Sequence, residues 1–203
     1  MATRRIGSET SATRAMLMDG VEAVMRELGY GALTARSVAE RAGLKHQLVY
    51  YYFETMDELL MATYLRHTGR VSESIEQAFL SPRPLHALWQ VSSNPHDALL
   101  NMEFMALANH NPAIRAETVA FGERIRRIGL EGIQRTLGPS PGEASPIALA
   151  MAVSALGMNL GMEATLGISG GHAELKALVE WCLDRLEVGE LAGAKAVQDS
   201  AKE

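Results

Sequence analysis

Cysteine is almost absent from this chain, with one residue among 203. A single cysteine, Cys182, excludes an internal disulfide and a cysteine-cluster metal site, and its apolar neighbours indicate a small core residue. Aromatic residues make up only 5% of the chain, and runs of β-branched residues are missing, which argues against a sheet-rich fold. Ala, Leu, Met and Glu are abundant instead. The composition therefore predicts an all-α protein.

Long apolar segments are also missing. We expect no stretch of the chain to be both long enough and apolar enough to span a bilayer. The first residues, MATRRIGSETSATR, lack the apolar core of a secretory signal peptide. The sequence therefore predicts a cytoplasmic protein without a membrane partner.

Patterns that carry catalytic chemistry are likewise missing. The 6 histidines form no H-E-x-x-H or similar arrangement, and we expect His67 and His86 to be exposed. The glycines within residues 167–171 indicate a turn and not a phosphate-binding loop. We therefore predict that the protein is not an enzyme, with no catalytic residue, metal site or cofactor.

What the chain does contain is a pattern of two short helices joined by a glycine turn. It lies in residues 34–60, TARSVAERAGLKHQLVYYYFETMDELL. Thr34 is expected to cap the first helix, on which apolar residues recur on one face. Gly43 stands where the chain must turn with a positive φ, and the second helix is expected to begin at Lys45. This layout is that of a helix-turn-helix that reads DNA.

The same stretch resembles the N-terminal signature of TetR-family transcriptional regulators. The resemblance rests on the spacing T-x-x-x-V-A-x-x-A-G-L-x-x-x-x-V-Y-x-Y-F-x-x-x-x-E-L-L. It implies a three-helix DNA-binding domain, a recognition helix that enters the major groove, and a helical C-terminal domain that dimerises and binds an inducer. The matching residues are Thr34, Val38, Ala39, Ala42, Gly43, Leu44, Tyr50, Tyr52, Phe53, Glu58, Leu59 and Leu60.

Candidate DNA contacts follow from the second helix and from the resemblance. Lys45, His46 and Gln47 can donate hydrogen bonds to base edges or phosphates from a helix N-terminus that already favours anions. The resemblance implies that the second helix of the domain reaches a base or phosphate and that two tyrosines contact the DNA backbone. The complete set of candidates is Arg36, Lys45, His46, Gln47, Leu48, Tyr50, Tyr51 and Tyr52.

One position departs from the family pattern. Met56 stands where the resemblance implies a lysine that touches a phosphate, and methionine cannot make that contact. Lys45 stands where the family often has serine. We hypothesise that the cation has moved from one position to the other, which affects affinity more than function.

The charge of the chain is the main objection to DNA binding. Its net charge of −5 is unlike that of a nonspecific nucleic-acid binder, because phosphate neutralisation supplies most of such affinity. Residues 1–56, however, carry seven cations and six anions, so the acidity lies in the rest of the chain. Arg4 and Arg5 can form an arm that reaches a minor groove, or they belong to a frayed terminus, which is the interpretation we favour.

Helical periodicity and helix breakers divide the rest of the chain. Helices are expected at residues 11–28, 57–79, 85–91, 96–108, 113–137, 147–166 and 172–186, which makes nine with the two of the helix-turn-helix. We expect residues 1–56 to form the DNA-binding domain and residues 57–188 a helical effector-binding and dimerisation domain. Residues 189–203, small and polar, are expected to be a disordered tail.

The last two long helices are the expected dimer interface. Ala148, Ala152 and Ala155, with the pair Gly157 and Gly161, would keep one surface small and let another helix approach closely. Two such helices from each subunit would make a four-helix bundle across a two-fold axis. The alternative is that these faces pack only within the monomer.

A site for a small-molecule effector is expected in the helical body. Methionine and aromatic side chains there suit a largely hydrophobic ligand, and a few polar side chains would orient it. The alternative is that these residues are plain core, which is the interpretation that we favour for any single one of them. The candidates are Asn101, Met102, Met105, Phe121, Ile125, Met158, Asn159 and Met162.

These patterns together predict a sequence-specific DNA-binding regulator. We expect a repressor that binds a pseudo-palindromic operator as a homodimer and is released by a hydrophobic small molecule. The alternative is a helical carrier of hydrophobic ligands without a DNA-dependent function. A carrier, however, would have no use for exposed Lys45, His46 and Gln47 behind a capped turn.

Overall fold

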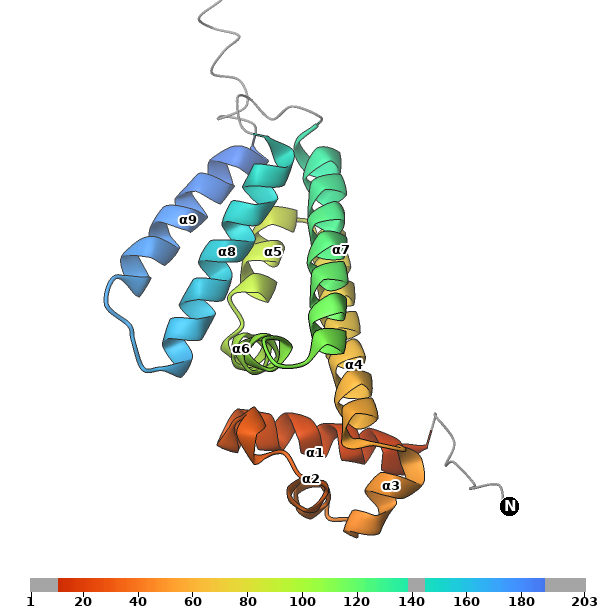
Figure 1. Cartoon of the computed structure of the whole chain (residues 1–203). Coiled ribbons are helices and arrows are strands. Elements are labelled where there is room, and N and C mark those ends of the chain that lie inside the picture. Colours follow the sequence, from red (N-terminus) through yellow and green to blue (C-terminus); the bar gives the residue numbers. More distant parts are fainter. Residues whose placement is uncertain (1–10, 139–144, 189–203) are drawn as a thin grey trace, which may run out of the picture. The chain divides into compact units, whose positions relative to one another are not determined.

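The computed structural model of the chain describes residues 11–138 and 145–188. Within these ranges the protein is all-α, as the composition predicts, and it has nine α-helices and two short 3-10 turns (Figure 1). The Arg4–Arg5 arm and the tail at residues 189–203 lie outside the described residues. The helices are α1 (Ala12–Leu28), α2 (Ala35–Arg41), α3 (Val49–Tyr52), α4 (Met56–Ala78), α5 (Pro84–Ser92), α6 (Pro95–Ala108), α7 (Pro112–Leu137), α8 (Pro146–Thr165) and α9 (His172–Glu187), and the 3-10 turns are η1 (Tyr30–Ala32) and η2 (His46–Leu48).

Proline marks the beginning of four of these helices. Pro84, Pro95, Pro112 and Pro146 are the first residues of α5, α6, α7 and α8. The first N–H of a helix has no intrahelical partner, and the proline ring fixes φ near its helical value, so proline is favourable at this position. The helices therefore start one residue before the starts that the apolar periodicity predicts.

The described helices group into two compact units. The first consists of residues 11–69 together with Leu100–Val119, and the second of Arg70–Leu99 together with the described residues from Ala120 onward. α4, α6 and α7 therefore each contribute residues to both units. The boundary expected after residue 56 separates a DNA-binding from an effector-binding function and stays a prediction.

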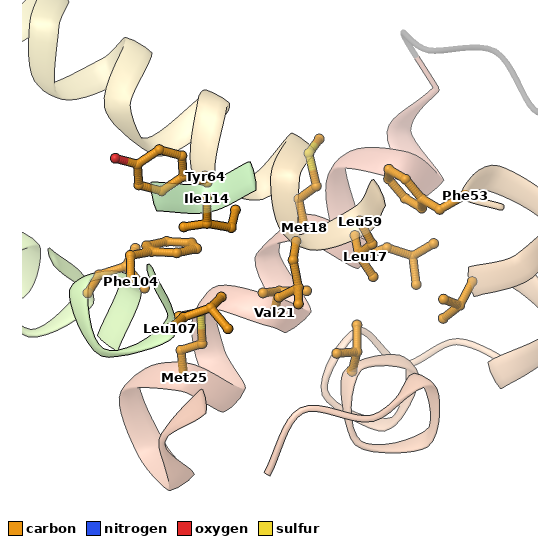
Figure 2. Close-up of a cluster of buried hydrophobic side chains, with 14 of the residues drawn as sticks. Leu17, Met18, Val21, Met25, Phe53, Leu59, Tyr64, Phe104, Leu107 and Ile114 are labelled. Carbon is orange, nitrogen blue, oxygen red and sulfur yellow. The ribbon is translucent and has the colours of Figure 1, made fainter. Parts of the chain in front are cut away.

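The core of the first unit forms around one face of α1. Leu17, Val21 and Met25 recur at four-residue spacing along this helix, and each is at most 1% exposed. Figure 2 shows these side chains next to residues from α4, α6 and α7, among them Phe104, whose ring lies edge-on to Tyr64 with centroids 4.9 Å apart. α6 is thus part of the core on which the N-terminal helices pack.

Two polar contacts fix α1 and α6 on α4 within this unit. Arg66 of α4 bonds the buried carboxylate of Glu22 in α1, with Nη2 2.8 Å from Oε1. His67 was expected to be exposed, but it is fully buried. Its Nε2 bonds Asn101 Oδ1 at 2.8 Å, and its ring stacks on Phe104. The sequence prediction failed because the polar face of α4 meets a polar side chain of α6.

The core of the second unit lies where α5 packs on α8 and α9. Gly157 and Gly161 of α8 are buried here, and a Cβ built on them would lie 2.8 Å from Ser92 Cβ and 3.0 Å from Ala98 Cβ. The prediction that this pair belongs to the dimer surface is therefore wrong. These glycines allow a close approach of helices within one chain.

α8 also corrects the expectation about apolar segments. By length and composition it could cross a membrane, with a mean hydropathy of 1.5 over its best window and only 28% of that window buried. One such helix is weak evidence for a membrane protein, since the core helix of a soluble protein passes the same test. One face of α8 packs on α5, and another face, which includes Met151 and Met158, is apolar and exposed in the single chain.

The N-terminal end of α5 is tied to the C-terminal end of α9. Glu187 Oε1 accepts a hydrogen bond from Leu85 N at 2.8 Å, and its other oxygen lies 2.9 Å from Nδ1 of His86. Arg83 adds ion pairs with Glu187 and Asp184. His86 is 14% exposed at its side chain, less than expected, because these carboxylates surround it.

Candidate DNA-binding site

The turn after α2 has the geometry that the sequence predicts. Thr34 Oγ1 caps α2 by accepting from Ser37 N at 3.0 Å, and Ser37 Oγ accepts in return from Thr34 N. Gly43 has a φ of 67°, which a side chain would oppose. Leu44 N then donates to Ala39 O at 2.8 Å and closes the turn.

The recognition segment is shorter as an α-helix than expected. Lys45 is extended, η2 takes up the next three residues, and only the four residues of α3 are α-helical before Phe53 becomes extended again. Val49 and the following tyrosines lose side-chain freedom in a helix, so this run favours a short helix. His46 and Gln47 therefore stand on a 3-10 turn at the entrance of α3.

The buried and exposed sides of this segment are clearly separated. Val49 and Phe53 are 0% and 1% exposed and belong to the core of the first unit. Two of the candidate contacts, Leu48 and Tyr52, are partly buried. The other six are exposed and free of the core: Arg36, Lys45, His46, Gln47, Tyr50 and Tyr51. This surface offers cations, amide and imidazole donors and tyrosine hydroxyls, the groups that bind phosphates and base edges.

Tyr52 connects the end of α3 to the beginning of α1. Hydrogen bonds from Ser11 and then Thr13 lower the pKa of its phenol below the ordinary value, against a smaller effect of burial. Its ring lies edge-on to that of Tyr51, with centroids 5.0 Å apart. Tyr52 therefore positions the first turn of α1 next to α3 and leaves Tyr50 and Tyr51 pointing to solvent.

The helix-turn-helix lies in a segment that is similar to known regulatory proteins. Residues 17–63 match the family model described as "Bacterial regulatory proteins, tetR family". This segment of the chain is therefore a TetR-type DNA-binding domain. Proteins with this domain are DNA-binding transcriptional regulators, so α2, η2 and α3 form the helix-turn-helix of a DNA-binding regulator. No curated protein matches the chain.

Solved structures of several regulators share the fold along most of the chain. A TetR transcription regulator from Haloarcula marismortui has a TM-score of 0.68 and 18% identity, covering 87% of this chain and 97% of that one. A tetR-family regulatory protein from Rhodococcus RHA1 has a TM-score of 0.64 and 20% identity, covering 87% and 98%. The fatty acid degradation regulator FadR from Bacillus halodurans has a TM-score of 0.66 and 14% identity, covering 92% and 98%. At these identities the similarity establishes a common fold.

The TetR-family lysine that Met56 replaces has no substitute at the start of α4. Met56 packs against the core of the first unit. Thr55 Oγ1 caps Glu58 N at 3.1 Å, and Glu58 Oε2 accepts from Glu54 N at 2.5 Å. With Asp57 also exposed, this end of α4 presents carboxylates. These carboxylates repel a phosphate. The hypothesis that Lys45 supplies the phosphate contact in place of residue 56 stays a prediction.

Arg14 is a further cation beside the helix-turn-helix, and no sequence pattern points to it. Its guanidinium lies 4.4 Å from the centroid of the Phe53 ring. Ser11 Oγ caps α1 by accepting from Arg14 N at 3.1 Å. The contact joins residues far apart in the chain, and neither local periodicity nor the TetR signature contains a signal for it.

The candidate effector contacts fall in different surroundings. Asn101 is partly buried and engaged with His67, and Ile125 packs against the core of the second unit. Met105 and Met158 are 57% and 47% exposed, and Asn159 is exposed and bonds Glu163. The remaining three, Met102, Phe121 and Met162, are partly buried. Their role as ligand contacts stays a prediction.

Proposed function

We propose that this TetR-family regulator is a homodimeric repressor of the genes next to a pseudo-palindromic operator. The observation that carries the proposal is the exposed polar surface of α2, η2 and α3. Val49 and Phe53, which are buried in the core, hold this surface in place. One such surface contacts one half-site, so specificity for a natural operator needs two of them.

DNA contacts divide into base-reading and backbone-binding residues. His46 and Gln47 stand at the entrance of α3, where side chains reach base edges in the major groove. Arg36, Lys45, Tyr50 and Tyr51 bind phosphates around them, and Leu48 packs on the groove wall. Arg14, held over Phe53, adds a phosphate contact from α1. The acidic rest of the chain keeps nonspecific affinity low.

The dimer forms through α8 and α9. On α8 the exposed side chains include Met151 and Met158, with the small residues Ala148, Ala152 and Ala155 on the same side. On α9 Leu178 and Trp181 are 56% and 49% exposed. Large apolar side chains at helical spacing on two adjacent helices support burial against a second copy.

A largely hydrophobic small molecule is the effector that we propose. Asn101, Met102, Met105, Phe121, Ile125, Met158, Asn159 and Met162 remain the candidate contacts. The similar B. halodurans protein is described as a regulator of fatty acid degradation, so long-chain acyl compounds are the first probes. Binding of the effector would change the distance between the two helix-turn-helix elements of the dimer, and the protein would then release the operator. The protein acts in the cytoplasm, where its operator lies.

Selection of bound duplexes from a random DNA pool tests this function. The purified protein should enrich a palindromic motif with half-sites about one helical turn apart or somewhat more. Enrichment of a single half-site would contradict the homodimer. The absence of any enriched sequence would favour a helical carrier of hydrophobic ligands, which binds its ligand without binding DNA.

A further inference from the structure

The connection between α1 and α2 is held by a side chain from another part of the chain. α1 ends at Gly29, whose φ of 79° lies in the left-handed region, and the chain continues into the 3-10 turn η1. The first N–H of η1, that of Tyr30, donates to Glu103 Oε2 of α6 at 2.6 Å. Glu103 thus caps η1 from α6, although the two residues are 73 positions apart in the sequence.

This cap replaces one that the local sequence cannot supply. The first N–H groups of a helical turn have no partner within the turn, and a side chain just before it ordinarily accepts from them. Here that position is Gly29, which has no side chain. A carboxylate makes a charge-assisted hydrogen bond, roughly twice as strong as a neutral one. Glu103 therefore restrains the Tyr30 backbone by a charge-assisted hydrogen bond.

What η1 positions is the helix-turn-helix itself. Ala32 O, at the end of η1, accepts from Ser37 Oγ at 2.8 Å, and Ser37 belongs to the box that caps α2. Leu33 between them packs against the core of the first unit. A shift of η1 therefore moves the first turn of α2, and with it the orientation of Arg36.

Glu103 itself stands on a firmly held part of α6. Asn101 bonds the buried His67, and Phe104, 1% exposed, packs between Tyr64 and His67. Because Asn101 and Phe104 are both held by buried contacts, the backbone at Glu103 is fixed and its carboxylate cannot move far if η1 shifts. The restraint is thus directed from α6 onto η1.

We propose that Glu103 is a positioning residue for DNA binding, which fixes the α1–α2 connection by capping η1 from α6. The inference rests on the proposed function, because it concerns the affinity of the helix-turn-helix for its operator. Glu103 touches no DNA in this role. Its loss acts through the Tyr30 backbone and the start of α2.

The test compares Glu103→Ala with Glu103→Gln, which keeps a carbonyl oxygen for the Tyr30 N–H. Glu117→Ala is the matched control, since it removes the same charge from α7 of the same unit. Hydrogen exchange at the Tyr30 amide is measured by NMR, and affinity is measured on the selected operator. For Glu103→Ala we expect exchange and operator dissociation constant each to rise about tenfold or more. Glu103→Gln should lie within about threefold of the unaltered protein, and Glu117→Ala should not differ.

Several outcomes would overturn the inference. If Glu103→Ala speeds hydrogen exchange at the Tyr30 amide but leaves the operator affinity unchanged, the cap has no role in DNA binding. Unchanged exchange would show that the hydrogen bond does not restrain the turn. If Glu103→Ala fails to fold, Glu103→Asp replaces it, because the shorter side chain withdraws the oxygen but keeps the charge. Absence of any duplex binding by the unaltered protein would instead overturn the proposed function, and the positioning role with it.

Discussion

The guanidinium of Arg14 lies 4.4 Å from the ring centroid of Phe53, which joins the first turn of α1 to the end of α3. The aromatic ring holds the partly buried cation by a cation–π contact. The start of α4 offers Met56 and exposed carboxylates instead of a cation. Arg14 is therefore a second candidate, beside Lys45, for the phosphate contact that Met56 cannot make.

Arg14→Gln should weaken operator binding on the order of tenfold at near-physiological salt, and it should reduce the salt slope of binding by about 1. Adding Met56→Lys to this variant should restore the slope, because a lysine at the start of α4 supplies the missing contact. Arg127→Gln on α7 is the control with the same loss of charge. A weaker affinity with an unchanged salt slope would mean that Arg14 acts only by packing on Phe53.

Base reading and phosphate binding should separate within η2. His46→Ala and Gln47→Ala should each cost about 1 to 3 kcal/mol at particular base pairs. Lys45→Ala should weaken operator and random DNA alike, because a phosphate contact does not depend on sequence. Competition binding against single-base variants of the operator measures both effects. Equal losses on operator and random DNA for all three variants would refute the assignment.

The apolar face of α8 and α9 should control the oligomeric state. Trp181→Asp, alone or with Leu178→Asp, places a charge in the proposed interface and should cost about 2 kcal/mol or more of association free energy. Sedimentation should then show a monomer where the unaltered protein is a dimer. Leu80→Asp, which changes a 67% exposed leucine outside both helices, is the control. A dimer that survives both substitutions would place the interface elsewhere.

Two glycine substitutions should change stability in opposite directions. Gly157→Ala forces a methyl group to within 2.8 Å of Ser92 Cβ and 3.0 Å of the Ser92 carbonyl carbon, so it should destabilise the fold by about 1 to 3 kcal/mol. Gly69 lies within α4 with nothing near its Cβ position, so Gly69→Ala should stabilise by up to about 1 kcal/mol. Urea unfolding at one protein concentration compares them. A neutral Gly157→Ala would mean that α5 can move away from α8.

Acid should weaken the junction of α8 and α9. Glu163 Oε2 lies 2.7 Å from Nε2 of His172, and this hydrogen bond, followed by one from Asn159, lowers the pKa of the carboxyl below its ordinary value of 4.5. Because the folded pKa is the lower one, the stabilisation is present above the unfolded pKa and is lost as the pH falls through the folded pKa.

Urea unfolding between about pH 6 and about pH 3 checks this sign. The unaltered protein should lose more stability over that range than Glu163→Gln, in which nothing titrates at this position. Parallel curves for the two proteins would show that the Glu163–His172 contact does not contribute to folding.

The local structure of the helix-turn-helix could be predicted because it depends on residues that are close in the sequence. Thr34 caps α2 through a residue three positions away, and the positive φ of Gly43 follows from the need to turn within a few residues. The helix boundaries were also predictable from prolines and glycines, apart from shifts of about one residue, which is usual for helix ends. α3 came out shorter than expected, since its β-branched and aromatic residues favour a helix only weakly.

Errors arose where one face of a helix meets another helix. His67 is polar and was expected outside, but Asn101 and Phe104 of α6 enclose it. Gly157 and Gly161 were correctly identified as sites of close approach, but the approaching chain is α5 and the start of α6 and not a second subunit. Periodicity identifies which residues share a face and contains no information on which partner covers it.

By itself, the sequence determined an all-α chain, the positions of its helices, and a TetR-type helix-turn-helix with its exposed polar residues, because capping, periodicity and turn conformation depend on neighbouring residues. Only the tertiary structure decided that Arg14 rests on Phe53, that Glu103 caps η1, and that one face of α8 is used within the chain while the other stays exposed. These contacts join residues distant in sequence, and packing of the whole core decides which distant residues meet.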